Sequence, residues 1–407
     1  MIFKTIKLSF LSLFILGSFL YTLGVMRIGS AIWGDTHYYY AYTKSIVMDR
    51  DINFFNEAYQ PEFGFPNPPV ISKETNRVEN IFSPGVSILW IPGFALGQTF
   101  SWLANTIGLG IPLNGYSLIT QITTGITTVG MGFIGLYFLF LTISKIFSKK
   151  VALVTSISLL ATTSLLYYTI IDPFNSHSGS FLISAIVLWI TTLLKTDEAK
   201  NSIWIKLGFA LGWLGLIRNQ DILLALPIFI WIMFQQNSIF QKFSAIFKIG
   251  LMISLVMSIQ LITTYYLYGQ IHSPYILHGQ QLSWLNPDFW RVLFSFNNGI
   301  INFSPIIIAS LIGLITLIKE KSVIARIGFI FFLLELYVIS SWVPEIIGGP
   351  YGSRMFTATL PWLGLGLAKV WSWIINQKQQ YGIIFGSLII LLFFHNVIRT
   401  IWMLYVW

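Results

Sequence analysis

The sequence predicts an all-α polytopic membrane protein, and two observations carry that prediction. Hydrophobic residues make up 55% of the 407-residue chain and charged residues only 10%, whereas soluble domains carry about a quarter charged residues. The mean hydropathy is +0.73, and several uncharged runs are long enough to cross a bilayer. This composition excludes an ordinary soluble enzyme, and its high apolar content excludes a disordered chain.

The basic residues indicate membrane topology rather than binding to nucleic acid. The net charge is +9, but Lys and Arg recur in small groups between apolar runs instead of forming one patch. The chain has no cysteine, so it has no disulfide, thiolate metal site or thiol nucleophile.

The first apolar run, 8–26, predicts a helix that crosses the membrane. Lys4 and Lys7 precede it, which places its start on the cytoplasmic side. Arg27 interrupts the run where a signal peptide would have small residues for cleavage. We therefore expect an uncleaved anchor.

A polar stretch, 34–83, follows, and residues 80–144 contain no charged side chain. Two apolar pieces lie in this region: 84–102, which Pro92 and several glycines interrupt, and the cleaner 116–144. If only the second piece crosses, every later lysine cluster lies inside. The clusters are Lys145/Lys149/Lys150, Lys195/Lys200/Lys206, Lys242/Lys248, Lys319/Lys321 and Lys378. We therefore predict that 84–105 is interfacial or re-entrant and that 116–144 spans.

The remaining runs complete a single domain, 1–407, of about 11 transmembrane helices. Further spans are expected at 151–171, 178–194, 203–219, 221–236, 248–267, 303–318, 324–342, 356–374 and 382–402. The first outer loop covers 34–115, with juxtamembrane or re-entrant helices at the outer face, and 116–407 holds the remaining spans. The amino terminus is then inside and the carboxyl terminus outside.

The outer connections are long and chemically mixed, which favours a function there over a simple cap on the bundle. Asp35 follows the first span, just before His37 and the tyrosines Tyr38–Tyr40. It is either a general base, because a carboxylate at a dry interface has a raised pKa, or a helix-capping residue.

Asp172 and His177 flank a tight outer hairpin, in which Pro173 enforces a break. The pair would bind a metal or orient a substrate, but two residues are an incomplete ligand set. A simple turn is the alternative. The sequence implies no cofactor firmly and leaves a divalent metal open.

Two arginines are candidates for binding phosphate. Arg218 lies between two apolar segments near the outer face, where it either pairs with Asp221, reaches to the interface or holds a phosphate. Arg354 follows a loop rich in Gly and Pro that also contains Tyr351, and such a loop aims one cation at a ligand. The predicted substrate pocket consists of His37, Tyr38, Asp172, His177, Arg291, Glu345 and Tyr351.

Several short stretches, in their order along the chain, resemble the GT-C superfamily of integral-membrane glycosyltransferases. The bacterial branch with protein mannosyltransferases and lipid A aminoarabinose transferases is the most similar. The stretches are Gly34–Asp35 with Tyr38–Tyr40, FSPG at 82–85, PFNSH at 173–177, GFALGWLGLIRNQDILLALP at 208–227, LFSFNNGIINFSPIIIASLIGLI at 293–315 and GGPYGSRMFTATLPWLGLGLA at 348–368.

The resemblance implies an acidic catalytic base in the first outer loop, which maps onto Asp35. It also implies polyprenyl-phosphate sugar donors with arginines on the phosphate, and Arg354 and Arg218 are the positions that match. The chain departs from the aminoarabinose branch, whose Lys-Pro-Pro-Leu element is replaced by Asn67–Val70, and a second loop acid of the Asp-x-Asp kind is missing.

We therefore predict a glycosyltransferase with a GT-C-like bundle in the bacterial plasma (inner) membrane. It would transfer a sugar from a polyprenyl-phosphate donor to the hydroxyl of a glycan, lipid or protein acceptor, among membrane lipids, with its active site facing the outside or periplasm. The main alternative is a transporter or flippase for a lipid-linked or anionic solute; a structural or assembly subunit is a third.

Overall fold

Helices form most of the computed structural model, which describes residues 2–194, 202–235, 238–277, 281–342, 351–377 and 379–406. The longer helices are α1 (Ile2–Ile28), α4 (Gly85–Thr106), α5 (Leu118–Ile146), α6 (Lys149–Thr162), α7 (His177–Leu193), α8 (Ser202–Ile217), α9 (Ala225–Met233), α10 (Ile239–Tyr268), α14 (Ile306–Lys319), α15 (Val323–Ser341), α16 (Leu360–Ile375) and α17 (Gln379–Val406). The shorter elements are α2 (Thr36–Lys44), η1 (Ser45–Asp49), α3 (Phe55–Ala58), η2 (Tyr167–Ile171), η3 (Asn219–Leu224), α11 (Pro274–Leu277), α12 (Phe289–Phe294), α13 (Ile300–Phe303) and η5 (Arg354–Thr359). In these ranges β structure is limited to isolated bridges. The predicted all-α class is confirmed.

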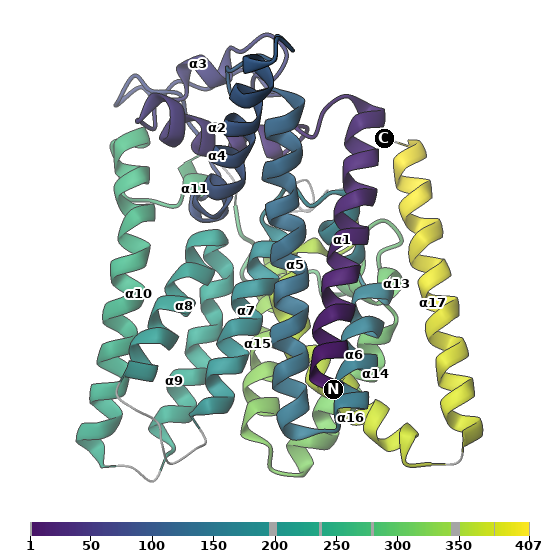
Figure 1. Cartoon of the computed structure of the whole chain (residues 1–407). Helices are drawn as coiled ribbons and strands as arrows, with labels where there is room; N and C mark the ends of the chain where they lie inside the picture. The colour runs from purple at the N-terminus through teal and green to yellow at the C-terminus, as the bar shows by residue number, and fades with distance from the viewer. Residues whose placement is uncertain are drawn as a thin grey trace.

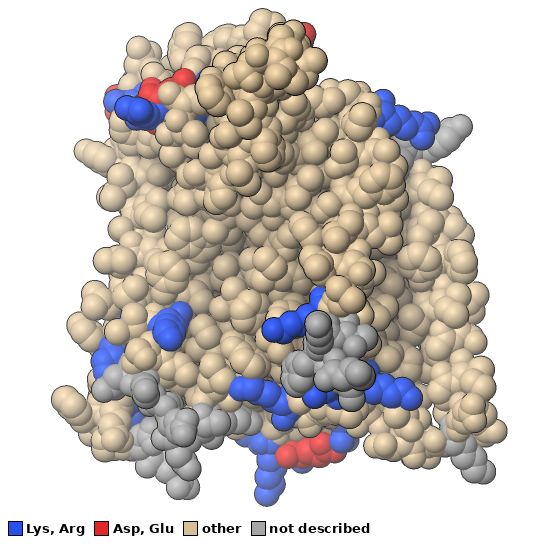
Figure 2. Space-filling model, viewed as in Figure 1, with Lys and Arg blue, Asp and Glu red and all other residues tan. Residues whose placement is uncertain are grey.

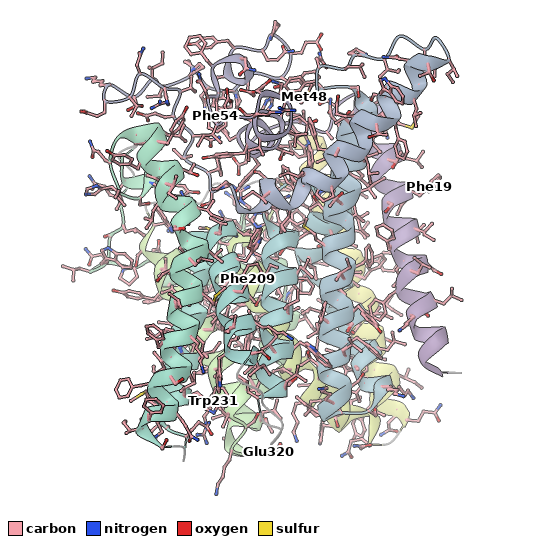
Figure 3. All side chains as sticks on the ribbon, turned by 60° about the vertical axis from the view of Figure 1, so that its left-hand side comes forward. Phe19, Met48, Phe54, Phe209, Trp231 and Glu320 are labelled. Atoms are coloured by element: carbon pink, nitrogen blue, oxygen red, sulfur yellow. The ribbon has the colours of Figure 1, made fainter. Side chains whose placement is uncertain are left out.

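The long helices run roughly along one axis, and the first loop covers their upper end (Figure 1). Helix α1 begins at the lower end, and α17 finishes at the upper end, on the right (Figure 1). Figure 3 shows Met48 and Phe54 of the first loop at the upper end and Glu320 at the lower end. Phe19 points outward from α1 (Figure 3) and is 58% exposed, as expected of a side chain that faces lipid.

Length and composition mark six helices of the described chain as candidate membrane spans: α1, α4, α5, α10, α15 and α17. Four shorter segments of the described chain, α7, α8, η3 with α9, and α14, are also apolar. Each span that the sequence predicts overlaps one helix or two consecutive helical segments. The number of helices that cross the bilayer remains a prediction.

Charged side chains separate along the axis of the bundle. Figure 2 shows most of the visible Lys and Arg near the lower end, and acidic side chains mainly near the upper end. A broad band without charged side chains lies between them (Figure 2). The order of the helices explains the basic side chains at the lower end. Lys145, Lys206 and Lys319 lie near the lower ends of α5, α8 and α14.

The segment 84–105 differs from the expected interrupted piece, because α4 is one continuous helix despite Pro92. The glycines of α4 do not interrupt the helix; they allow it to pack closely against its neighbours. A Cβ at Gly93 or Gly97 would collide with threonines of α5, and one at Gly85 would collide with the carbonyl of Leu216. Helix α4 packs on the first part of α5 and lies in the upper part of the bundle (Figure 1). Whether it spans remains a prediction.

Buried charges and backbone contacts fix the first loop to the bundle. Lys44 Nζ lies 2.7 Å from Asp49 Oδ2 and 2.8 Å from Glu57 Oε1. The pKa of Glu57 is raised to about 7, mainly by burial and also by its hydrogen bond with Asp49, whereas Lys44 opposes the shift. At the other end of the loop, Arg77 Nη1 donates to the carbonyl of Tyr266 at 3.0 Å. The short helices expected in this loop are therefore present and anchored.

Helices α14 and α16 cross so closely that their backbones are in contact. A Cβ at Gly366 would collide with the carbonyl oxygen of Ser310. We expect Gly366→Ala to destabilise the protein by about 1–3 kcal/mol, as overpacking does in close-packed cores. Thermal unfolding in detergent measures the effect. Gly382→Ala in α17, where no atom lies within 4 Å of the added Cβ, is the matched control and should lower the melting temperature little or not at all.

Candidate active site

Asp35 lies where the chain turns from α1 into α2. Gly34 has a positive φ of 55°, which glycine adopts without strain. Thr36 Oγ1 then donates to the carbonyl of Phe174 at 2.6 Å, so the start of α2 is joined to the hairpin between η2 and α7. This contact fixes the backbone next to the carboxylate.

Arg354 reaches Asp35 from the opposite side of the site. Ser353 has a positive φ of 47°, and its hydroxyl donates to the carbonyl of Asn298. Arg354 Nη1 lies 3.0 Å from Asp35 Oδ2, with 25% and 40% of the two side chains exposed. The two residues are far apart in sequence, and the ion pair is accessible to a ligand.

Arg218 lies next to Arg354. It occupies the extended break between α8 and η3, and its Nη1 donates to the carbonyl of Arg354 at 3.3 Å and to His177 Nδ1 at 3.1 Å. A guanidinium only donates, so His177 Nδ1 accepts, and a neutral ring carries its proton on Nε2. Two cationic side chains therefore meet at the upper end of α7, α8 and α16.

A buried amide contact connects the two segments that carry these arginines. Gln220 Nε2 donates to Glu335 Oε2 at 2.6 Å and approaches the carbonyl of Met355 at 3.5 Å. Glu335 is fully buried in α15. The Gln220 contact joins η3 to η5, so a shift of one arginine-bearing segment is resisted by the other.

A cavity of about 710 Å³ opens beside the two arginines. Asp35, Arg218 and Arg354 supply its charged wall, whereas Leu282, Trp284, Val338 and Trp342 are among its apolar lining residues. Its volume falls in the range of about 300–1,000 Å³ that is usual for small-molecule sites. A ligand with an anionic group and an apolar part matches this lining.

A second, smaller cavity of about 240 Å³ lies on the other side of Asp35. Tyr38, Pro68 and Glu79 line it, and Asp35, Asn67, Ile81 and Phe82 line both cavities. Asp35 therefore lies at the junction of two spaces, and only the larger one contains arginine.

Asp172 belongs to the electrostatic surroundings of this junction. Loss of hydration raises its pKa to about 7; the nearby Arg354 charge opposes that shift, and the Asp35 charge adds to it. Asn175 Nδ2 donates to the backbone carbonyl of Asp172, which holds the hairpin closed. The acid therefore changes charge near neutral pH.

The other predicted pocket residues divide into two groups. His177 lines the larger cavity and Tyr38 the smaller one. His37 instead contacts the carbonyl of Phe63 through Nδ1 at 3.0 Å, and loss of hydration lowers its pKa. It is absent from the lining of both cavities.

Arg291 and Tyr351 also lie outside the lining of these two cavities. Arg291 Nε contacts Asp288 Oδ2 at 3.3 Å, and Nη2 donates to the carbonyl of Trp342 at 3.1 Å. Tyr351 is buried and stacks on Tyr167 with ring centroids 4.4 Å apart. Glu345 lies outside the described residues.

Sequence reasoning did not select Asn67, Gln220 or Tyr275, which all line the larger cavity. Gln220 had a signal, because it stands in a polar run between two apolar segments, two residues after Arg218. In the described ranges, no three His, Asp or Glu side chains gather closely enough to hold a metal ion.

Comparison with known proteins gives a match to a family model and a similarity to a solved structure. Residues 118–262 match the family model described as dolichyl-phosphate-mannose-protein mannosyltransferase. The fold is similar to the crystal structure of ArnT from Cupriavidus metallidurans in the apo state, with a TM-score of 0.58 and 11% sequence identity. The similarity covers 94% of this chain and 62% of that chain, so this chain spans less than two thirds of ArnT. No curated protein matches the sequence.

Proposed function

We propose that this chain, whose fold is similar to that of ArnT, is a membrane glycosyltransferase of the GT-C type that uses a polyprenyl-phosphate sugar donor. The observation that carries the proposal is the position of Asp35, between a cavity with two arginines and a cavity with none. This geometry suits one carboxylate acting between an anionic donor and a hydroxyl acceptor. The family match over residues 118–262 supports the same reaction class.

The donor would occupy the larger cavity. Its phosphate would take the place of Asp35 on Arg354 and contact Arg218, since guanidinium groups bind phosphate in a bidentate manner. The apolar wall with Trp284 and Trp342 would lie along the first isoprene units. The rest of the tail would extend into the lipid around the bundle.

Transfer would proceed by attack of an acceptor hydroxyl on the anomeric carbon. Asp35 takes the proton of the hydroxyl as the new carbon–oxygen bond forms, and the bond between the anomeric carbon and the phosphate oxygen breaks. Polyprenyl phosphate leaves with the electron pair, and Arg354 and Arg218 stabilise its charge. General base catalysis contributes about 10²–10⁴-fold, and fixed cations near developing charge contribute several kcal/mol more.

The site would face the outside of the cell. Most of the visible Lys and Arg lie at the end of the bundle opposite the first loop (Figure 2), and basic residues of membrane proteins concentrate on the cytoplasmic side. The end that carries Asp35 would then be periplasmic or extracellular, in the plasma membrane of a bacterium.

The test is turnover by the purified protein in lipid with a panel of radiolabelled polyprenyl-phosphate sugars. The proposal predicts release of free polyprenyl phosphate from at least one donor, dependent on Asp35. Saturable donor binding that Arg354→Ala abolishes, without any turnover, would contradict an enzyme and favour a carrier. A panel with neither turnover nor binding would reject the donor class.

Donor binding is expected to tighten as the pH falls through about 7. Above that value Asp172 is ionised and competes with the donor phosphate for Arg354, whereas below it Asp172 is protonated and neutral. A charge interaction of about 1 kcal/mol corresponds to about a fivefold change in Kd. Titrations on both sides of pH 7 measure it, and Asp172→Asn should remove the dependence. If the donor Kd of Asp172→Asn changed with pH as much as that of the unsubstituted protein, another group would cause the effect.

A further inference from the structure

The smaller cavity is built from the first loop alone. Its lining comes from Asp35 and Tyr38 at the start of α2, from residues 65–70, and from Glu79, Ile81 and Phe82. Its volume of about 240 Å³ is just below the range of about 300–1,000 Å³ that holds drug-sized ligands. The space therefore suits one small group, such as a single sugar ring, next to the Asp35 carboxylate.

Backbone pairing makes this cavity a formed feature of the loop. The amide of Glu79 donates to the carbonyl of Val70 at 2.8 Å, and the amide of Ser72 donates to the carbonyl of Arg77 at 2.9 Å. Asn80 Nδ2 donates to the carbonyl of Tyr38 at 2.9 Å. The segment that carries Pro68 and Glu79 is thus a closed hairpin tied to α2.

The charged residues that line the smaller cavity are both acidic. Asp35 and Glu79 line it, and its lining contains no Lys or Arg. Ionised carboxylates only accept hydrogen bonds and repel an anion, so hydroxyl donors match this wall and a phosphate does not.

Aromatic rings form the apolar part of the lining. The Tyr38 ring centroid lies 4.4 Å from that of Phe65 and 5.2 Å from that of Phe82. Flat rings beside hydroxyl-accepting groups suit a sugar, which has an apolar face and several hydroxyls at its edge. A serine or threonine side chain offers only one hydroxyl and no such face.

We propose that the smaller cavity binds an uncharged sugar ring as the acceptor, with Glu79 accepting its hydroxyls and Tyr38 packing on its face. The inference rests on the proposed transferase function and makes it more specific, because the nucleophile is then a hydroxyl of a neutral glycan. A phosphorylated sugar and a peptide hydroxyl are excluded as preferred acceptors.

Binding of the acceptor is measured first, without any donor. Saturation-transfer NMR on the purified protein in nanodiscs compares an uncharged alkyl hexoside, the same hexoside with a phosphate monoester, and a serine-containing peptide. We expect saturable binding of the uncharged hexoside, at least about tenfold tighter than the other two, because a charged hydrogen bond is worth about 1.5–3 kcal/mol. Stronger binding of the phosphorylated hexoside or of the peptide overturns the proposal.

Matched variants test whether the hexoside binds in the smaller cavity. Glu79→Gln should weaken hexoside binding by about tenfold, whereas Glu62→Gln, an exposed acid of the same loop, should not change it. Asn67→Lys, which adds a cation at the junction with Asp35, should shift the preference toward the phosphorylated hexoside. Equal effects of Glu79→Gln and Glu62→Gln would refute the assignment, provided that both variants keep the melting temperature of the unsubstituted protein.

Donor turnover then separates this inference from the proposed function. Release of polyprenyl phosphate that depends on Asp35, together with no hexoside binding, would overturn the acceptor assignment and leave the transferase standing. Hexoside binding without turnover of any donor would support the subsite and contradict the transferase.

Discussion

Asp35→Asn is expected to reduce sugar transfer by about 10²–10⁴-fold or more, the contribution of a general base. The amide keeps the size of the side chain but cannot accept the acceptor proton. Because the substitution also removes the partner of Arg354, which lies 3.0 Å away, donor binding should be retained or tightened. The transfer rate and the donor Kd, measured on the same preparation, show whether kcat falls while donor binding is retained.

The melting temperature provides the control, because the Asp35 side chain is 40% exposed and its loss should cost little stability. A variant with full activity would remove Asp35 from the mechanism. Parallel losses of donor binding and rate would instead indicate that Asp35 holds the site together and does not act as the base.

Arg354→Ala is expected to weaken donor binding by about tenfold to several hundredfold and to slow transfer as well. The loss combines a charged hydrogen bond of about 1.5–3 kcal/mol with lost stabilisation of the leaving phosphate, for which single donors contribute about 10²–10³ in kcat. Arg354→Lys should recover only part of both, because an ammonium group cannot make the bidentate contact. Donor titrations and single-turnover rates measure the two effects.

Arg326→Ala provides the matched arginine control, since this exposed residue lies in the first turn of α15, at the lysine-rich end. It should change neither donor binding nor transfer. If Arg326→Ala and Arg354→Ala had the same effect, general electrostatic attraction to the membrane surface would explain it, and Arg354 would lose its specific role.

The helices were largely predictable from sequence because each apolar run is a local signal. The exception is α4, where Pro92 and the glycines indicated an interruption. A proline lacks one amide hydrogen, and neighbouring packing compensates for that loss when glycines allow close contact. The contacts of Gly93 and Gly97 with α5 lie far away in sequence, so no local pattern contained that information.

The sequence indicated the individual site residues but not their arrangement in space. Asp35, Arg218 and Arg354 were selected from their loops, yet their meeting depends on α2, η3 and η5 reaching the same end of the bundle. Adjacent residues of α2 also have different surroundings. Tyr38 lines the smaller cavity, whereas His37 contacts the carbonyl of Phe63. Successive side chains of a helix point about 100° apart, and only the packing of α2 decides which one faces the cavity.

The ion pair of Asp35 with Arg354 has a consequence for the order of events. The Asp35 oxygen that would take the proton lies 3.0 Å from the guanidinium of Arg354. An arriving phosphate competes for that guanidinium and releases the carboxylate at the moment when a sugar lies within reach. Binding of the donor would thus free the base, and the protein without a donor would not use Asp35 to activate a water molecule.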